Sequence, residues 1–217
     1  MQGQINIDEK LGLTIYNFSK EKNIKNILDI GTWNGYGSTM CIIKGIIDSN
    51  KKDYNFISVE SDYKQALLAQ ANLENYSSYV KLMFGTIADV EDLVSLNDYG
   101  ELFYSQYPRS LQEQWLKAEV EQYNSSPCIY DQIIDSMNNN IDLLILDGGE
   151  YGTNAEFNKL KDISKIIIMD DTTTIKNYKN AQTIRNSNGL FNIIEDDINI
   201  RNGIMVAKNE SLKDHKQ

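Results

Sequence analysis

The stretch NILDIGTWNGYGST, residues 26–39, joins a short apolar run to a glycine-rich turn. The run over 26–30 is typical of a buried strand in a parallel sheet. The turn carries Gly31, Gly35 and Gly37, which suit either a tight strand-to-helix turn or the close approach of a ligand to the backbone. These glycines lack the G-x-G-x-x-G spacing of dinucleotide-binding folds, and no Lys followed by Ser or Thr completes a P-loop. The turn therefore does not predict a pyrophosphate site.

Segments with strand and helix character alternate along the chain. Besides 26–30, strands are predicted over 54–61, 80–86, 141–147, 165–171, 190–196 and 203–209. Helices are predicted over 8–22, 62–78, 153–163 and after the glycine turn up to residue 49. The last two strands flank the turn signal Asn202-Gly203 and predict an antiparallel hairpin. The alternation predicts an α/β fold in a single domain, 1–217: a Rossmann-like three-layer sandwich whose mostly parallel seven-stranded sheet ends in this hairpin.

Residues 88–135 interrupt the alternation. Within this stretch, Pro108 and Pro127 flank a segment whose apolar residues recur at helical spacing. We therefore predict a helical insertion, which is either an ordinary packed helix or a lid over a site, because long insertions in compact domains often serve as lids.

Net charge, cysteine spacing and the length of the apolar stretches indicate which classes of partner to expect. The net charge is −10 and the isoelectric point is near 4.6, which argues against nucleic acid and anionic membranes, because both attract positive proteins. Cys41 and Cys128 form no CxxC pair, and no stretch approaches the roughly 20 apolar residues of a membrane span. We expect a cytoplasmic protein with a small-molecule substrate, no nucleic-acid partner and no membrane partner; a homodimer stays open.

Polar side chains stand where the predicted parallel strands end. The carboxyl ends of such strands meet at one edge of the sheet, where ligands of open α/β sheets bind. The carboxylate of Glu60 suits a nucleoside-like cofactor, since it can accept hydrogen bonds from both ribose hydroxyls. The side chains at this edge are Asp29, Glu60, Thr86, Asp147, Asp170 and Asp171.

Five segments in this order resemble a known family: ILDIGTWNGYGST, ISVES, LMFGTI, IDLLILDGGEY and IIIMDD. They resemble class I S-adenosylmethionine-dependent methyltransferases, and more narrowly the small-molecule O-methyltransferases of the catechol and macrocin type, many of which bind magnesium. The resemblance covers roughly residues 24–208, apart from the insertion. It implies O-methylation of a small polar acceptor, such as a sugar, a nucleotide-linked sugar or a phosphorylated intermediate.

The resemblance also implies which residues bind S-adenosylmethionine. Asp29 would reach the amino group, directly or through water, and Glu60 would hold the ribose. Ser61 or Asp62 would lie near the adenine, and Thr86 with Ile87 would flank the ring. Trp33 is either a core residue or part of the wall of the site. The implied cofactor residues are Asp29, Gly31, Thr32, Trp33, Gly35, Glu60, Ser61, Thr86 and Asp147.

In the metal-dependent members, acids after the fourth and fifth strands bind Mg²⁺, and here Asp147, Asp170 and Asp171 stand at those positions. Mg²⁺ prefers oxygen ligands and lowers the pKa of a bound hydroxyl. Three carboxylates at one edge repel each other, which a metal or an organic cation would relieve. Asp170 and Asp171 could instead cap the next helix, since Asp is a good N-cap residue.

The general base departs from the family pattern. The catechol-type enzymes have a lysine three residues after the strand-four acid, and this chain has Glu150 there. Glu150 could be the base if burial raises its pKa; alternatively, the metal suffices or the acceptor oxygen is already anionic. The resemblance thus implies the catalytic residues Asp147, Glu150 and Asp170. Related sequences often have a histidine or another polar residue where Gly148 and Gly149 stand. The missing lysine and histidine motivate a different hypothesis, a non-catalytic module that binds S-adenosylmethionine.

Overall fold

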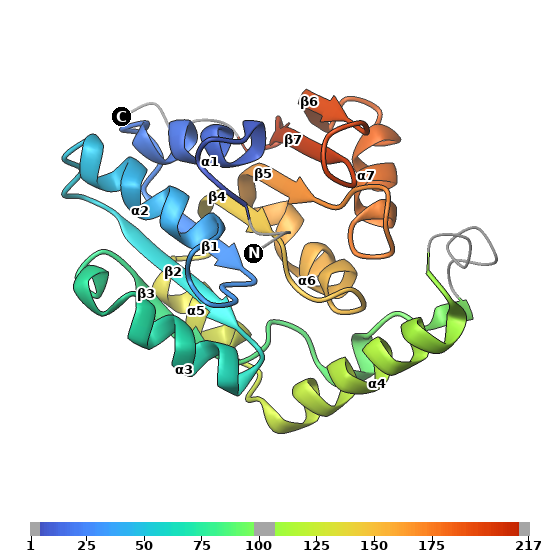
Figure 1. Cartoon of the computed structure of the whole chain (residues 1–217). Coiled ribbons are helices and arrows are strands. Elements are labelled where there is room, and N and C mark those ends of the chain that lie inside the picture. Colours follow the sequence, from blue (N-terminus) through green and yellow to red (C-terminus); the bar gives the residue numbers. More distant parts are fainter. Residues whose placement is uncertain (1–4, 98–106, 213–217) are drawn as a thin grey trace.

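The computed structural model describes residues 5–97 and 107–212 (Figure 1). Its strands are β1 (Asn26–Ile30), β2 (Asn55–Glu60), β3 (Lys81–Phe84), β4 (Ile141–Leu146), β5 (Ser164–Asp170), β6 (Phe191–Asp197) and β7 (Ile204–Asn209). Its helices are α1 (Lys10–Lys20), α2 (Ser38–Asp48), α3 (Tyr63–Asn72), α4 (Arg109–Ser125), α5 (Tyr130–Ser136), α6 (Thr153–Leu160) and α7 (Tyr178–Arg185), with short 3-10 turns η1 (Glu74–Tyr76), η2 (Val90–Asp92) and η4 (Lys161–Ile163). Among these residues, no helix has both the length and the apolar composition that crossing a membrane would require.

The strands form one seven-stranded sheet in the order β3-β2-β1-β4-β5-β7-β6. β1 pairs in parallel with β2 and β4, whereas β7 runs antiparallel to both β5 and β6. The predicted mostly parallel sheet with its C-terminal hairpin is confirmed. The chain moves outward from β1 to β3 and then returns to β4 on the other side of β1, so the direction of winding reverses between β1 and β4. Ligands of open α/β sheets bind at such a reversal, beside the carboxyl ends of the strands.

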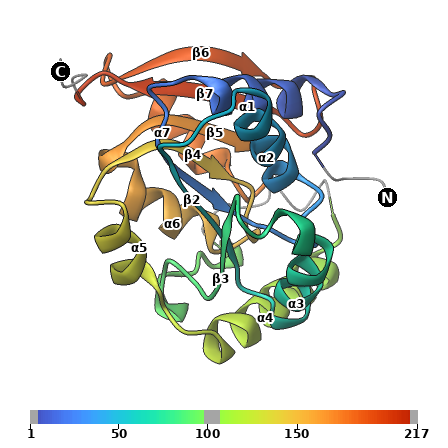
Figure 2. The same ribbon diagram turned by 90° about the vertical axis from the view of Figure 1, so that its left-hand side faces the viewer.

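Helices cover both faces of the sheet, which gives the three predicted layers (Figure 2). On one face, Leu11 of α1 and Ile42 of α2 pack with Ile27 and other strand residues. On the other face, α5, α6 and α7 pack against the opposite side of the same strands, for example through Phe157 beside Leu146. Fully burying an aliphatic or aromatic side chain stabilises a fold by roughly 1.5–3 kcal/mol. Burial on both faces explains why the parallel strands read as continuous apolar runs.

The stretch 88–135 contains two different parts, and its residues 98–106 lie outside the described residues. α5 buries Ile133 in the core against the sheet, so it is the crossover helix between β3 and β4. α4 lies beyond the two helical layers, at the end of the sheet where the parallel strands finish (Figure 1). The helix predicted between the two prolines is therefore present as α4. α5 belongs to the sandwich, so only the segment that precedes α5 is an insertion.

Candidate active site

The glycine turn after β1 brings three strand ends together. The N–H of Gly31 donates to the carbonyl of Val59 on β2 at 3.0 Å. Gly31 has φ +98°, and a Cβ at this position would lie 2.0 Å from the carbonyl oxygen of Asp147 after β4. Only glycine allows both this backbone conformation and this approach. The turn therefore sets how closely β1 and β4 meet at the point where the winding reverses.

A cavity of about 370 Å³ opens at this point, within the range of small-molecule sites. Its wall includes six of the predicted cofactor residues: Gly31, Thr32, Trp33, Glu60, Ser61 and Asp147. It also includes residues that the sequence did not indicate, among them Ser38, Gly85, Gln122, Glu156 and Lys176. The structure thus brings most of the predicted cofactor residues to one cavity, but of the six predicted strand-end side chains only Glu60 and Asp147 line it.

Glu60 is held in place by the backbone on either side of it. Its Oε2 accepts the N–H of Trp33 at 2.6 Å, and its Oε1 accepts the N–H of Asp62 at 2.8 Å. The side chain is buried, and burial raises the pKa of Glu60, although the two N–H groups favour the ionised form. Trp33 is 53% exposed, so it belongs to the cavity wall and not to the core.

A second cavity, of about 360 Å³, lies between α3 and strands β2 and β3. Its wall is mostly apolar and includes Leu67 of α3 and Phe84 of β3. Thr32 and Glu60 line both cavities. A ligand held by Glu60 can therefore contact either space.

Asp29 does not line the main cavity. It is fully buried, and its carboxylate accepts hydrogen bonds from the hydroxyls of Ser38 at 2.7 Å, Thr39 at 2.6 Å and Ser58 at 2.9 Å. Burial raises the pKa of Asp29, while the three hydroxyls oppose this shift. Since Ser38 lines the cavity, Asp29 can act on a ligand only through such a neighbour.

Gly35 and Thr86 also lie off the cavity wall. A Cβ at Gly35 would come within 2.8 Å of the Leu73 side chain, so this glycine makes room for packing. Thr86 is buried in a parallel bridge with Cys128, and its N–H donates to the carbonyl of Pro127. Gly85, the residue before it, lines the cavity instead.

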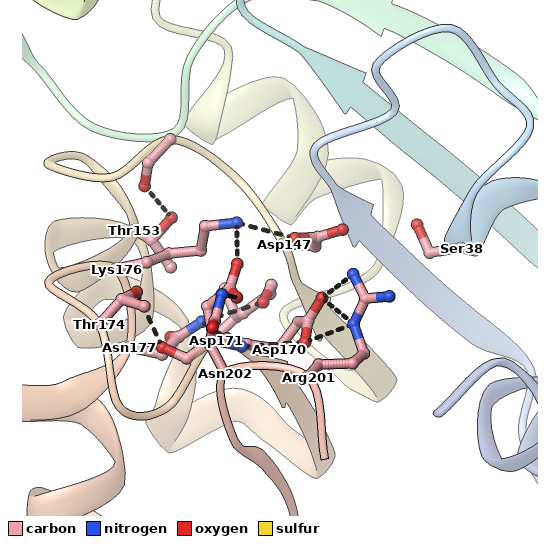
Figure 3. Close-up of polar contacts among 12 residues, drawn as sticks. Ser38, Asp147, Thr153, Asp170, Asp171, Thr174, Lys176, Asn177, Arg201 and Asn202 are labelled. Atoms are coloured by element: carbon pink, nitrogen blue, oxygen red, sulfur yellow. Dashed lines mark hydrogen bonds and ion pairs between the residues drawn. The ribbon is translucent and has the colours of Figure 1, made fainter. Parts of the chain in front are cut away.

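The three predicted metal ligands, Asp147, Asp170 and Asp171, come together with carboxylate oxygens within 4.8 Å of one another. Two basic side chains pair with them (Figure 3). Lys176 Nζ lies 2.9 Å from Asp147 Oδ1 and 2.8 Å from Asp171 Oδ2. The guanidinium of Arg201 binds Asp170, with Nε 2.8 Å and Nη2 2.7 Å from Oδ2. The repulsion among the acids is thus relieved by organic cations of the chain itself.

The protonation preferences follow from burial and from these pairs. Burial and the charge of Asp147 raise the pKa of Asp170 to about 6, although Arg201 opposes the shift. Burial alone would raise the pKa of Asp171, but Lys176 and Asn202 bring it below its usual value. Burial would lower the pKa of Lys176, but Asp147, Asp171 and Glu150 raise it well above its usual value. Lys176 is therefore a permanent cation and a poor general base.

The residues present do not fit a resident Mg²⁺ as arranged. Mg²⁺ takes oxygen ligands at about 2.0–2.1 Å in a nearly octahedral shell. Both oxygens of Asp170, both of Asp171 and one of Asp147 already accept hydrogen bonds from the chain. The Lys176 ammonium lies between Asp147 and Asp171, where an ion that bridges them would have to bind.

Glu150, the predicted general base, lies outside the main cavity. It lines a small crevice with Trp115 of α4 and Ile175 of the loop after β5. Burial raises the pKa of Glu150, and the charge of Lys176 opposes the shift. The structure therefore brings Glu150 near the acids but not to the wall that the predicted cofactor residues share.

Two other carboxylates occupy the space beside Gly148 and Gly149. Glu119 of α4 accepts the N–H of Gly152 at 2.7 Å, and a Cβ at Gly149 would lie 2.2 Å from its Oε1. Glu156 of α6 lines the main cavity, and a Cβ at Gly148 would lie 2.9 Å from its Oε2. The two glycines therefore leave room for acids that come from α4 and α6.

Glu156 has the properties expected of a proton acceptor. Its Oε1 accepts the hydroxyl of Tyr123 at 3.1 Å, and its Oε2 has no hydrogen-bond donor among the described residues. Burial, together with the charge of Glu119, raises the pKa of Glu156 to about 7. A base whose pKa lies near neutral pH is the most effective at that pH.

Four charged residues of the site, Glu119, Glu156, Lys176 and Arg201, were not predicted from the sequence. Glu119 and Glu156 occupy the buried stripes of their helices, beside Tyr123 and Phe157, and an acid on such a stripe is the signal that could have found them. Lys176 and Arg201 lie in loops that follow β5 and β6, and only the tertiary fold brings them to the acids.

No protein-family model matches the sequence, and no curated protein matches it either. Solved structures do match. The O-methyltransferase from Bacillus cereus in complex with SAH has a TM-score of 0.56 at 16% identity, over 92% of this chain and 80% of that one. TomG, an O-methyltransferase from Streptomyces achromogenes in complex with SAM, has a TM-score of 0.55 at 11% identity, over 91% and 78%. The SAH-bound Podospora anserina methyltransferase PaMTH1 has a TM-score of 0.52 at 14% identity, over 92% and 77%. The chain therefore has the fold of S-adenosylmethionine-dependent O-methyltransferases.

Proposed function

We propose that the chain is an S-adenosylmethionine-dependent O-methyltransferase with a small polar acceptor. The carrying observation is the cavity between the ends of β1 and β4, with Gly31 against Asp147 and the Glu60 carboxylate fixed in its wall. Support comes from the shared fold, because neighbours such as TomG and the Bacillus cereus enzyme were solved with SAM or SAH. A sugar, a nucleotide-linked sugar or a phosphorylated intermediate is our proposed acceptor class, on the family resemblance.

Each part of the cavity has a proposed role in binding the cofactor. Glu60 would accept hydrogen bonds from the two ribose hydroxyls, because both of its oxygens are already oriented by N–H groups of the chain. The turn at Gly31 would contact the methionine part, and Ser61 and Gly85 would lie near the adenine. Asp29 would act by holding Ser38, because its carboxylate accepts the Ser38 hydroxyl and Ser38 lines the cavity.

The proposed chemistry needs an oxygen nucleophile that is held in line and deprotonated. When bound, S-adenosylmethionine supplies a methyl group whose bond to sulfur breaks, with the electron pair left on sulfur, as the acceptor oxygen bonds to the carbon. Glu156, which lines the cavity, would take the proton of the acceptor hydroxyl. Gln122 of α4 lines the same cavity, so α4 would help to exclude water from the reacting groups.

The non-catalytic alternative loses part of its motivation. It rested on the lysine and the histidine that the family pattern has and this chain lacks, the lysine at the position of Glu150. Lys176 supplies a lysine at the same acidic cluster from the loop after β5, and Glu156 supplies a carboxylate that can accept a proton. Because the cation position between Asp147 and Asp171 is taken by Lys176, magnesium assistance is not part of the proposal.

Replacing Glu60 with glutamine should weaken S-adenosylmethionine binding by roughly tenfold to a hundredfold, since a hydrogen bond to a charged group contributes about 1.5–3 kcal/mol. The amide would also place an NH₂ group against an N–H donor of Trp33 or Asp62. Isothermal titration calorimetry measures the change directly.

The matched control is Glu74→Gln, which makes the same substitution at an exposed position just after α3. It should bind S-adenosylmethionine as the wild type does. Equal affinity of the Glu60 and Glu74 variants, both with normal thermal melts, would remove Glu60 from the cofactor site.

A further inference from the structure

Lys176 lies between two acids that the family resemblance assigns to a metal. Its Nζ is 2.9 Å from Asp147 Oδ1 and 2.8 Å from Asp171 Oδ2, and its side chain is only 10% exposed (Figure 3). An ammonium has three N–H donors, and these two contacts use two of them. Because Lys176 lines the main cavity, the third can reach an oxygen of a bound molecule.

The loop that carries Lys176 is tied to both neighbouring strands. The side chain of Asn177 donates to the carbonyl of Leu146 at 3.1 Å and to that of Asp170 at 2.7 Å. Asn180 on α7 holds the Asn177 side chain in turn, at 2.8 Å. The backbone beside Lys176 is therefore fixed, and its ammonium is held at the acids by the ion pairs with Asp147 and Asp171.

The two basic side chains occupy the positions from which a further cation would reach these carboxylates. Lys176 faces Asp147, Asp171 and Glu150, and Arg201 covers both oxygens of Asp170. A divalent ion would have to displace a buried ammonium and would then remain beside it. Two positive charges about 4 Å apart repel each other strongly in a partly buried site.

We propose that the ammonium of Lys176 takes the place of the divalent metal, so that the chain binds no metal at these acids and Lys176 holds the acceptor oxygen during methyl transfer. The second part of this proposal, the role of Lys176 in methyl transfer, rests on the proposed function. Lys176 donates a hydrogen bond to the acceptor oxygen and stabilises the negative charge that develops there as the proton passes to Glu156. The proton stays on Glu156, and Lys176 itself neither gains nor loses one.

The test is a titration with Mn²⁺ followed by electron paramagnetic resonance, on the wild type and on Lys176→Met. Wild type should bind no Mn²⁺ at one equivalent, whereas Lys176→Met should bind one ion, since Asp147 and Asp171 lose their cation. The double variant Lys176→Met/Asp147→Asn should lose that ion again. Lys165→Met is the matched control, because it also removes a lysine from an ion pair, at 2.8 Å from Asp142, away from the cavity; it should bind none.

A wild type that binds one Mn²⁺ when one equivalent is added would overturn the proposal, and this titration does not depend on whether any variant folds. A folded Lys176→Met protein that binds no ion would overturn it too. These titrations need neither cofactor nor acceptor. Their outcome therefore does not depend on whether the methyltransferase proposal is correct. Once an acceptor is found, wild-type transfer should be unchanged by a chelator, and transfer that stops with chelator and returns with Mg²⁺ would contradict the catalytic role of Lys176.

Discussion

Glu156→Gln is expected to abolish methyl transfer and, at the same time, to make the folded protein more stable at pH 8. Glutamine has nearly the same shape but cannot accept a proton, and loss of a general base lowers the rate roughly a hundredfold or more. Stability should rise because burial and Glu119 disfavour the ionised form of Glu156, as its pKa of about 7 indicates. Removing a buried charge that has so little compensation removes that cost.

The gain in stability should depend on pH in a defined direction. Glu156 keeps its proton up to about pH 7 in the folded protein, whereas an unfolded chain releases it near 4.5. The unfolded state therefore binds fewer protons between these values, and the wild type loses stability as pH rises through this window. The difference corresponds to up to about 3 kcal/mol. Glu156→Gln should unfold at higher urea concentration than wild type at pH 8 but not at pH 4.5.

The pH dependence of the methyl-transfer rate should also report the ionisation of Glu156. For the wild type, kcat/KM should rise with pH and level off above an apparent pKa of about 7, because Glu156 must be ionised to accept the proton. Glu74→Gln, at an exposed position, should change neither the rate nor the stability. A Glu156→Gln enzyme that keeps its rate and its pH profile would show that another group is the base.

Gly31→Ala is expected to unfold the protein partly or to open the cavity, with a loss of about 3 kcal/mol or more in stability. Two effects add here. The backbone has φ +98°, and a non-glycine residue in such a conformation costs on the order of 1–3 kcal/mol. The new Cβ would also lie 2.0 Å from the carbonyl oxygen of Asp147, and backbone on either side must move to admit it. Urea unfolding and S-adenosylmethionine titration should both register the change.

Gly189→Ala separates the two effects. Gly189 has a similar φ of +87°, but a Cβ there would meet nothing within 4 Å. It should therefore show only the conformational cost and should bind S-adenosylmethionine normally. If Gly31→Ala were no more destabilising than Gly189→Ala and kept full affinity, the close approach of β1 to β4 would have no part in shaping the site.

The strands and the strand-end residues could be predicted from sequence, because both depend on local pattern. The run over 26–30 coincides with β1, and the carboxylates of Glu60 and Asp147 reach the cavity because parallel strands end at one edge. The rest depends on contacts between distant segments. Thr86 is turned away by a bridge to Cys128, and Glu150 lies beyond the cavity wall.

Charge compensation was the least predictable property of the site. The sequence shows three acids and suggests a cation, but it does not say which cation. Lys176 follows Asp171 by five residues and Arg201 lies in the turn after β6, and neither spacing indicates an ion pair. Glu119 belongs to α4, whose buried positions also include Gln112. Burying a polar side chain costs free energy unless it is hydrogen-bonded. The Glu119 carboxylate is hydrogen-bonded, because it accepts the N–H of Gly152 in the loop after β4.

The most direct test of the account is a calorimetric titration of the wild-type protein with S-adenosylmethionine, with NADH as the control ligand. We predict that one equivalent of S-adenosylmethionine binds and that NADH does not, because the turn at Gly31 lacks the spacing that holds a pyrophosphate. Binding of NADH, or no binding of S-adenosylmethionine by a folded protein, would contradict the assignment of Gly31 and Glu60 to the cofactor and the methyltransferase proposal with it.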